Sequence, residues 1–221
     1  MNPVFAELQI FRDVEPRSAA MNMALDETLL EHASSPVLRF YGWARPSLSF
    51  GYFGSLADLS EMDRTRDVVR RWTGGGVVLH GSDFTYSVIL PSKNEVHLPS
   101  ARFIYTELHE AIRRALRDEG FVRLAEQNAP KISEACFANP VVADVLAHGR
   151  KIAGAAQRRT RAGLLHQGSI QYEALPCRFA EAFASELSPH LQPQTFAPEI
   201  LERAEHLVAE KYGTTAWLRR R

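Results

Sequence analysis

The sequence predicts an α+β fold, with a mixed and largely antiparallel sheet packed against helices. Short runs of apolar and aromatic residues bounded by Pro and Gly, typical of strands, outnumber the stretches with helical periodicity. These runs follow one another in hairpin-like succession, whereas a parallel fold would alternate strictly between strand and helix. The 221 residues are enough to bury a sizeable core, and we expect a single domain over residues 1–221.

The first half of the chain is expected to be rich in strands. Leu8–Val14 reads as a strand, and a helix follows over Ser18–Ala33, because Ser18 is a good N-cap and apolar residues recur every four positions. A polar helical stretch is expected between Gly54 and Asp67. The other expected strands are Pro36–Tyr41, Ser47–Tyr52, Val68–Trp72, Val77–Leu79 and Phe84–Leu90.

The second half begins with a strongly periodic helix over Ser100–Glu119, closed by Gly120. Three strands joined by tight turns are then expected at Val141–Leu146, Lys151–Gln157 and Leu164–Tyr172. The chain ends with a helix over Arg178–Glu186, a proline-rich connection over Pro189–Pro198, and a last helix over Pro198–Tyr212.

Composition excludes several classes of protein. The 26 Lys and Arg residues balance 26 Asp and Glu, and the pI is about 7.1, which argues against a nucleic-acid-coating protein. Uncharged runs such as residues 46–57 are too short to span a membrane, and no signal peptide is visible. Two isolated cysteines indicate a reducing compartment, so we expect a cytoplasmic protein without membrane contact. The scattered histidines predict no metal site.

A triple glycine between two expected strands is the most unusual segment. Gly74, Gly75 and Gly76 follow Arg70, Arg71 and Thr73. Without Cβ atoms, the backbone N–H groups are open to an anion or a carbonyl, and the arginines add positive charge at the rim. The alternative is a glycine hairpin with solvated arginines.

A second segment, Gly149–Arg158, places Lys151 at the start of a strand of very small residues. Gly154 and Ala155 leave room beside the strand, where larger β-branched residues would be usual in a core. The Lys151 ammonium is therefore a candidate for binding an oxyanion, and the alternative is a solvated lysine at a sheet edge.

Cys136 lies in a loop-like stretch before a strand, whereas Cys177 reads as structural. A lone cysteine is usually a small buried hydrophobic residue. A nearby cation such as Lys151 would instead favour the thiolate and make Cys136 reactive.

Several of these segments, taken in order, resemble the biotin/lipoate A/B protein ligase superfamily, over nearly the whole chain. The similarity is closest to cysteine-dependent octanoyltransferases and lipoate–protein ligase A. The matching motifs are Asn22–Glu27, Arg39–Trp43, Ser49–Phe53, Arg70–His80, Gly149–Gln157, and Lys211-Tyr212 followed by Trp217. The resemblance implies a catalytic domain like that of class II aminoacyl-tRNA synthetases and biotin ligases, with a groove for a medium-length acyl chain.

The resemblance implies a covalent mechanism if the chain is an octanoyltransferase. Cys136, in a Cys-Phe-x-x-Pro context, would take an octanoyl or lipoyl group from acyl carrier protein. A lysine of a lipoyl carrier domain would then receive it; the carrier is glycine cleavage H protein or a 2-oxoacid dehydrogenase E2. Lys151 would polarise the acyl carbonyl, and no cofactor is required.

The alternative is an ATP- and Mg-dependent lipoate–protein ligase that forms lipoyl-AMP and works with an accessory protein. Gly76 and His166 are closer to the ligase pattern, whereas the end of the chain at Arg221, with no further domain, favours the transferase. A non-catalytic lipoyl-binding module is less favoured because Lys151 and Cys136 are both present.

The resemblance also implies, by family position, that residues following the glycines or lying on the two later strands belong to the acyl or adenylate site. They are His80, Gln157, His166, Gly168 and Ser169, beside Arg70, Arg71, Thr73, Gly74, Gly75, Gly76, Gly154 and Ala155. For His80 and His166, the alternative is a surface or core histidine. Residues 68–82 and 145–172 together hold seven Lys and Arg residues and no Asp or Glu. We therefore expect a basic face at the site, suited to an acidic carrier protein or an acyl-adenylate.

Overall fold

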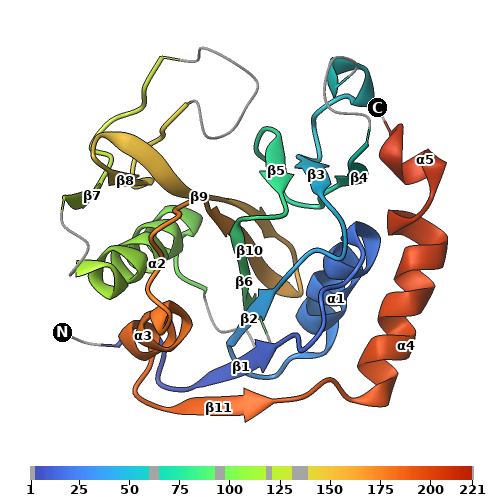
Figure 1. Ribbon diagram of the computed structural model, residues 1–221. Coiled ribbons are helices and arrows are strands. Elements are labelled where there is room, and N and C mark those ends of the chain that lie inside the picture. Colours follow the sequence, from blue (N-terminus) through green and yellow to red (C-terminus); the bar gives the residue numbers. More distant parts are fainter. Residues whose placement is uncertain (1–2, 60–64, 93–97, 118–120, 131–138, 221) are drawn as a thin grey trace.

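A computed structural model describes residues 3–59, 65–92, 98–117, 121–130 and 139–220, and shows two sheets with helices around them (Figure 1). The larger sheet has eight strands among these residues, in the order β11-β1-β2-β6-β10-β9-β8-β7. They are β1 (Leu8–Arg12), β2 (Val37–Tyr41), β6 (Phe84–Pro91), β7 (Val122–Leu124), β8 (Val145–Ala147), β9 (Arg150–Arg159), β10 (Gly163–Ile170) and β11 (Leu191–Gln194). The smaller sheet contains β3 (Ser47–Phe50), β4 (Asp67–Arg70) and β5 (Val78–His80), in the order β4-β3-β5.

Pairing in the larger sheet is mixed. Strand β1 is parallel to both β11 and β2, and the pairs from β2 to β7 are antiparallel. The predicted α+β class with a largely antiparallel sheet is therefore confirmed. The separation of β3, β4 and β5 into a second sheet was not foreseen.

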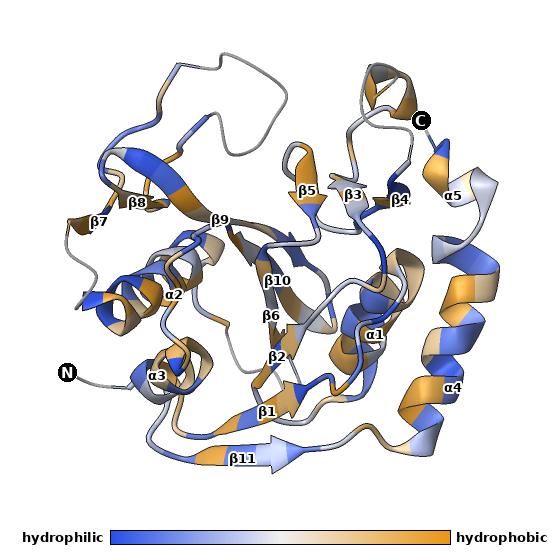
Figure 2. Ribbon diagram, viewed as in Figure 1, coloured by the Kyte–Doolittle hydropathy of each residue, from blue (hydrophilic) through white to orange (hydrophobic). Residues whose placement is uncertain are grey.

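Helices cover both faces of the larger sheet. On one face lie α2 (Ala101–Ala115) and α3 (Phe179–Leu187), and on the other lie α1 (Ala19–His32) and α4 (Pro198–Leu207). In β10, Leu164 packs with the α2 and α3 side, while Leu165 packs with α1. This follows from the two-residue period of a strand and explains why β10 is buried throughout. In Figure 2, hydrophobic and hydrophilic residues alternate along α4, as expected of a helix with one face on the core.

Helix α1 buries polar residues as well as apolar ones. Arg39 of β2 is fully buried and donates to Asp26 at 2.8 Å, to Asn22 at 2.9 Å and to Asp13 at 2.7 Å. Burying a guanidinium without partners is costly, and these hydrogen bonds and ion pairs offset that cost. The motifs around Asn22 and Arg39 thus form a polar core between α1 and the sheet.

Two predicted elements differ from the structure for identifiable reasons. The expected connection over Pro189–Pro198 contains β11, a parallel edge strand in which Pro193 sits opposite Ile10. Proline is tolerated there because an edge strand leaves one row of backbone groups unpaired. The strand expected over Val141–Leu146 begins only at Val145. The residues before it form a turn, because Ala143 has a φ of 69° and the Asp144 carboxylate accepts from the Val141 N–H.

Several shorter elements also differ from those predicted from the sequence. Strand β7 and the short helix α5 (Thr215–Leu218) were not predicted. The expected last helix divides into α4 and a π-helical turn over Val208–Tyr212. Between Gly54 and Asp67 the described part contains a 3-10 helix, Leu56–Leu59, and residues 60–64 lie outside the described part. None of the described helices has the length and apolar character needed to cross a membrane.

Candidate active site

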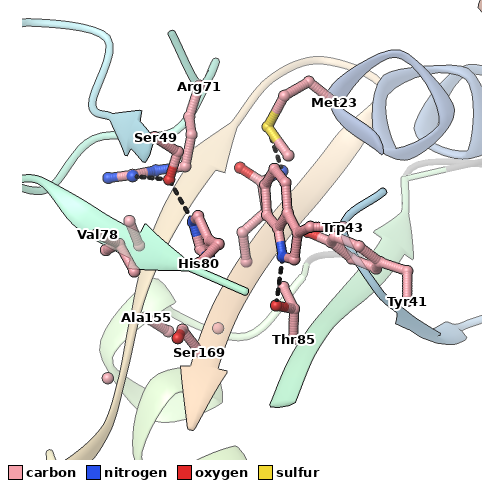
Figure 3. A pocket seen from close by; sticks show the side chains of 14 residues that line it. Met23, Tyr41, Trp43, Ser49, Arg71, Val78, His80, Thr85, Ala155 and Ser169 are labelled. Atoms are coloured by element: carbon pink, nitrogen blue, oxygen red, sulfur yellow. Dashed lines mark hydrogen bonds between the residues drawn. The ribbon is translucent and has the colours of Figure 1, made fainter. Parts of the chain in front are cut away.

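A narrow pocket of about 400 Å³, its open mouth included, lies between the two sheets (Figure 3). Its walls come from α1, β2, β3, β5, β6, β9 and β10, so segments from most of the chain meet there. The apolar part of the wall includes Met23, Tyr41, Trp43 and Val78. Of the predicted site residues, six line this pocket: Arg71, His80, Gly154, Ala155, Gly168 and Ser169.

Lys151 lies against the back of the pocket wall at Gly154. Its Nζ is 2.8 Å from Asp144 Oδ2, and both side chains are almost completely buried. A Cβ on Gly154 would stand 2.6 Å from the Lys151 Nζ and 2.4 Å from its Cε. A side chain at position 154 would therefore require the end of the Lys151 side chain to move away from the strand.

Tyr105 of α2 completes the support of this ion pair. Its hydroxyl donates to Asp144 Oδ1 at 2.5 Å and accepts from the N–H of Ala155 at 3.2 Å. Burial and the Asp144 charge both raise the pKa of Tyr105, which therefore stays protonated as the donor. The Tyr105 hydroxyl thus links the pocket wall at Ala155 to Asp144, the ion-pair partner of Lys151. Sequence patterns offered no signal for Asp144 or Tyr105, which precede Lys151 by 7 and 46 positions.

The segment Gly74–Gly76, which we term the glycine loop, is held in place by the side chain of Arg71. The guanidinium of Arg71 donates to the carbonyl oxygens of Gly74 at 3.0 Å and Gly76 at 2.7 Å. Gly75 has a φ of 84°, which glycine adopts without strain. Arg71 is buried, and it shapes the loop as well as lining the pocket.

A chain of hydrogen bonds runs along one side of the pocket through Ser49, His80 and Asp83. Ser49 Oγ is 2.6 Å from His80 Nε2, and His80 Nδ1 is 2.7 Å from Asp83 Oδ2. Arg71 donates to Ser49 Oγ at 2.6 Å, and the His80 ring stacks on Trp43 at 4.0 Å. Burial lowers the pKa of His80 despite the neighbouring Asp83, so the ring is neutral and donates from Nδ1.

Asp83 ties this chain to the neighbouring strands. Its Oδ2 also accepts from Thr85 at 2.9 Å and from Ser169 at 2.7 Å. Burial raises the pKa of Asp83, but the hydrogen bonds from His80 and Ser169 outweigh it and hold the pKa below its usual value. The carboxylate that partners His80 is thus three residues after it.

Thr73, Gln157 and His166 lie around the pocket without lining it. Thr73 donates to Gln167, and Gln167 in turn donates to Asp26 at 2.8 Å, so Thr73 is linked to the polar core of α1. His166 faces the other side of β10, where it contacts Gln157 at 2.9 Å and Tyr86 at 3.2 Å. The alternation of a strand explains this, because Gln167 occupies the pocket side.

Arg70 has a different role from its neighbour. Its guanidinium donates to the carbonyls of Tyr52 and Gly54, and to those of Trp217, Leu218 and Arg220 near the end of the chain. Successive residues of a strand point to opposite sides, so Arg70 and Arg71 diverge. Arg70 fastens the C-terminal segment and does not line the pocket.

Cys136, the predicted nucleophile, lies outside the described residues. Among the described residues before and after it, the N–H of Ala129 donates to the carbonyl of Pro140 at 2.8 Å. Cys177 is an exposed free thiol. Within the described ranges, no three His, Cys, Asp or Glu side chains gather to hold a metal ion.

Residues 18–194 match the family model of the lipoyl protein ligase A/B catalytic domain. The chain belongs to this family. It is 40% identical to the octanoyltransferase LipM of Oceanobacillus iheyensis, in an alignment that covers 72% of this chain and 62% of that relative, less than two thirds of its length. It is 32% identical to the octanoyltransferase LipM of Kyrpidia tusciae, with 90% of this chain and 94% of that relative covered.

Among solved structures, a bi-partite lipoate protein ligase from Thermoplasma acidophilum, studied with its E2 lipoyl domain, has the same fold. The TM-score is 0.72 at 20% identity, with 99% of this chain and 98% of that chain covered. The lipoyl protein ligase fold predicted from the motifs is therefore confirmed.

Proposed function

We propose that this lipoyl protein ligase family member is an acyltransferase of protein lipoylation, which moves an octanoyl or lipoyl group onto a lysine of a carrier protein. The observation that carries this proposal is the buried Lys151 ammonium, held by Asp144 against Gly154 at the wall of an apolar pocket. An apolar pocket suits a medium-length alkyl chain, and a fixed ammonium suits the oxygen of its carbonyl. The identity to two octanoyltransferases supports the same activity.

In the first step, the Cys136 thiolate attacks the carbonyl carbon of an acyl thioester. A carbon–sulfur bond forms to Cys136, the bond to the donor sulfur breaks, and the donor leaves as a thiol after taking up a proton. The negative charge that develops on the carbonyl oxygen is stabilised by the Lys151 ammonium, which is already oriented and largely removed from water.

In the second step, the amine of the acceptor lysine attacks the Cys136 thioester. An amide bond forms, the carbon–sulfur bond breaks, and the proton lost by the amine balances the charge of the released thiolate. The Lys151 ammonium acts on the same carbonyl oxygen in both steps, so one charge serves both transition states.

The partners in this proposal are an acyl carrier protein as donor and a lipoyl domain as acceptor, either glycine cleavage H protein or a 2-oxoacid dehydrogenase E2. The transferase reaction itself needs no cofactor, because the thioester already carries the activated acyl group. Octanoate or lipoate reaches the site only as part of that thioester.

The test combines purified protein, an apo lipoyl domain and octanoyl–acyl carrier protein. We expect octanoyl transfer to the domain and, without acceptor, a mass increase on the peptide that contains Cys136. Cys136→Ala abolishes both, whereas Cys177→Ala, which changes an exposed thiol, keeps both. Full activity of the Cys136→Ala variant would contradict the covalent mechanism.

A second candidate is an ATP-dependent lipoate ligase working with an accessory protein. It is favoured by Gly76 in the glycine loop and by a fold shared with a bi-partite ligase. ATP and Mg²⁺ would then be co-substrates that activate free lipoate. Supplying lipoate, Mg-ATP, the accessory protein and the lipoyl domain in place of the thioester separates the two reactions, since only the ligase labels the domain under those conditions.

A further inference from the structure

A cluster of aromatic and arginine side chains lies on the surface beside the site. It comprises Tyr52, Phe53, Arg158, Arg219 and Arg220, which we term the aromatic–arginine patch. Phe53 is 87% exposed, which is unusual for so large an apolar side chain. An open groove lined by residues 52–57 and by Arg219 and Arg220 runs across it. In Figure 1 the C-terminal end of the chain lies beside the segment that follows β3.

Two arginines of the patch, Arg158 and Arg220, are held by aromatic rings. Arg158 stacks over Tyr52 at 4.7 Å and over Trp72 at 5.1 Å. Arg220 stacks over Tyr52 at 4.7 Å and over Trp217 at 5.5 Å. Stacking fixes the plane of a guanidinium and leaves its N–H edge for a carboxylate or a phosphate.

The charge of the patch is not neutralised within the described part of the chain. No carboxylate among the described residues forms an ion pair with Arg158, Arg219 or Arg220, and the groove is lined by no acidic side chain. An exposed aromatic residue surrounded by arginines has the composition of an interaction hot spot, and its charge selects an acidic partner.

The distance from the reacting centre indicates what the partner carries. Arg158 and Lys151 lie on the same strand, β9, seven residues apart, which corresponds to roughly 20 Å. A lysine side chain, with its four-carbon stem, does not span that distance from a partner docked on the patch. A phosphopantetheine arm is much longer, and its phosphate is a ligand for arginine.

We propose that the aromatic–arginine patch docks the acidic acyl carrier protein, whose phosphopantetheine arm reaches from the patch into the pocket. This inference rests on the proposed function and adds the surface that selects the donor. It separates the two partners, since the acceptor domain must bring its lysine directly to the pocket and therefore uses a different surface.

The experiment measures transfer to the lipoyl domain from two donors, octanoyl–acyl carrier protein and the small thioester octanoyl-N-acetylcysteamine. For Arg219→Glu and Phe53→Ser we expect KM for the carrier-protein donor to rise at least fivefold with kcat unchanged. Both constants for the small thioester stay at the wild-type values. Matched controls are Arg123→Glu and Phe121→Ser, which change an exposed arginine of β7 and an 85% exposed phenylalanine before it, and they leave both donors unaffected.

A direct measurement of binding tests the docking site independently of acyl transfer. Calorimetric titration with octanoyl–acyl carrier protein gives a Kd that rises in the Arg219→Glu variant and with added salt. Equal losses with both donors, an unchanged Kd, or a rise in KM for the lipoyl domain alone would each overturn the docking site. If the wild-type protein binds the carrier but transfers nothing from either donor, the proposed function fails and the docking site stands.

Discussion

The Lys151 ammonium lies in space that is open because residue 154 is glycine. Gly154 faces both the pocket and the lysine, and Cβ at this position would overlap the lysine stem. Asp144 and Tyr105 hold the ammonium from the other side. The space left by glycine at position 154 therefore allows the Lys151 ammonium to lie beside this strand.

We expect Gly154→Ala to lower kcat by about 100-fold, because a shift of about 1 Å in a positioned charge has an effect of this size. The measurement is octanoyl transfer at saturating donor, with circular dichroism to show that the protein folds. Gly42→Ala is the control, since its Cβ would meet only Pro16 at 3.5 Å, an ordinary contact. Wild-type kcat in Gly154→Ala would refute the positioning argument.

At the scale of elements, the turn before β8 is strained. Ala143 has a φ of 69°, in the region that favours glycine. Its carbonyl nevertheless accepts from His109 at 2.7 Å, and the next residue is Asp144, so the turn places the lysine partner. The strain is retained because the turn is anchored on both sides.

Replacing Ala143 by glycine removes the strain, and we expect Ala143→Gly to raise the free energy of unfolding by about 1 kcal/mol. Urea denaturation at pH 7.5 measures the change. Ala147→Gly, in strand β8 and without a positive φ, should lower stability by a similar amount. Destabilisation by both substitutions would show that the turn is not strained.

The C-terminal segment is attached by Arg70, a residue of β4. Its guanidinium donates to three carbonyls near the chain end and to two after β3. Lys211 adds a contact of 2.6 Å to Glu27 of α1. The last residues are therefore part of the packed structure, and they form one wall of the aromatic–arginine patch.

Arg70→Ala should cost about 3 kcal/mol, because it leaves one buried and four partly buried carbonyls without this donor. We expect chymotrypsin to cleave after Trp217 or Leu218 faster in this variant than in the wild type. The control is Arg45→Ala, which removes an exposed ion pair of 3.7 Å to Asp67 and should change neither stability nor cleavage. Equal cleavage in the two variants would contradict the attachment.

At the scale of the whole molecule, buried histidines make stability depend on pH. Burial lowers the pKa of His109 to about 4, and burial also holds the pKa of His166 well below its usual value. The unfolded chain takes up these protons near pH 6.5, so the folded state loses stability as the pH falls from 6.5 toward 4. Asp83 affects stability at a lower pH than the histidines do. Its pKa in the folded state is depressed, so its contribution to stability is lost only as the pH falls below the usual carboxyl range.

From pH 7 to pH 5, His109 alone accounts for a loss of about 2 kcal/mol in the free energy of unfolding. We expect His109→Gln to reduce the measured loss by about this amount in urea titrations at the two pH values. The exposed His206 provides the control, since His206→Gln should leave the loss unchanged. If His109→Gln shows the full wild-type loss, burial of His109 is not its cause.

Much of this protein followed from the sequence because the relevant signals are local. The period of apolar residues located α1, α2 and α4, and alternation or apolar runs located β6, β9 and β10. The family motifs predicted the fold, and they singled out the glycine loop and the strand of Lys151. Segments without such signals, including β7, β11 and α5, were found only in the structure.

The tertiary structure decided which of the candidate residues meet. Arg70 and Arg71 are neighbours in sequence, yet one fastens the chain end and the other shapes the pocket. Asp144, Tyr105 and Ser49 gained their roles from partners that other segments supply. The sequence by itself determined the elements and the residue types available for chemistry. Sheet register and helix packing determined the contacts, because they join residues that are distant along the chain.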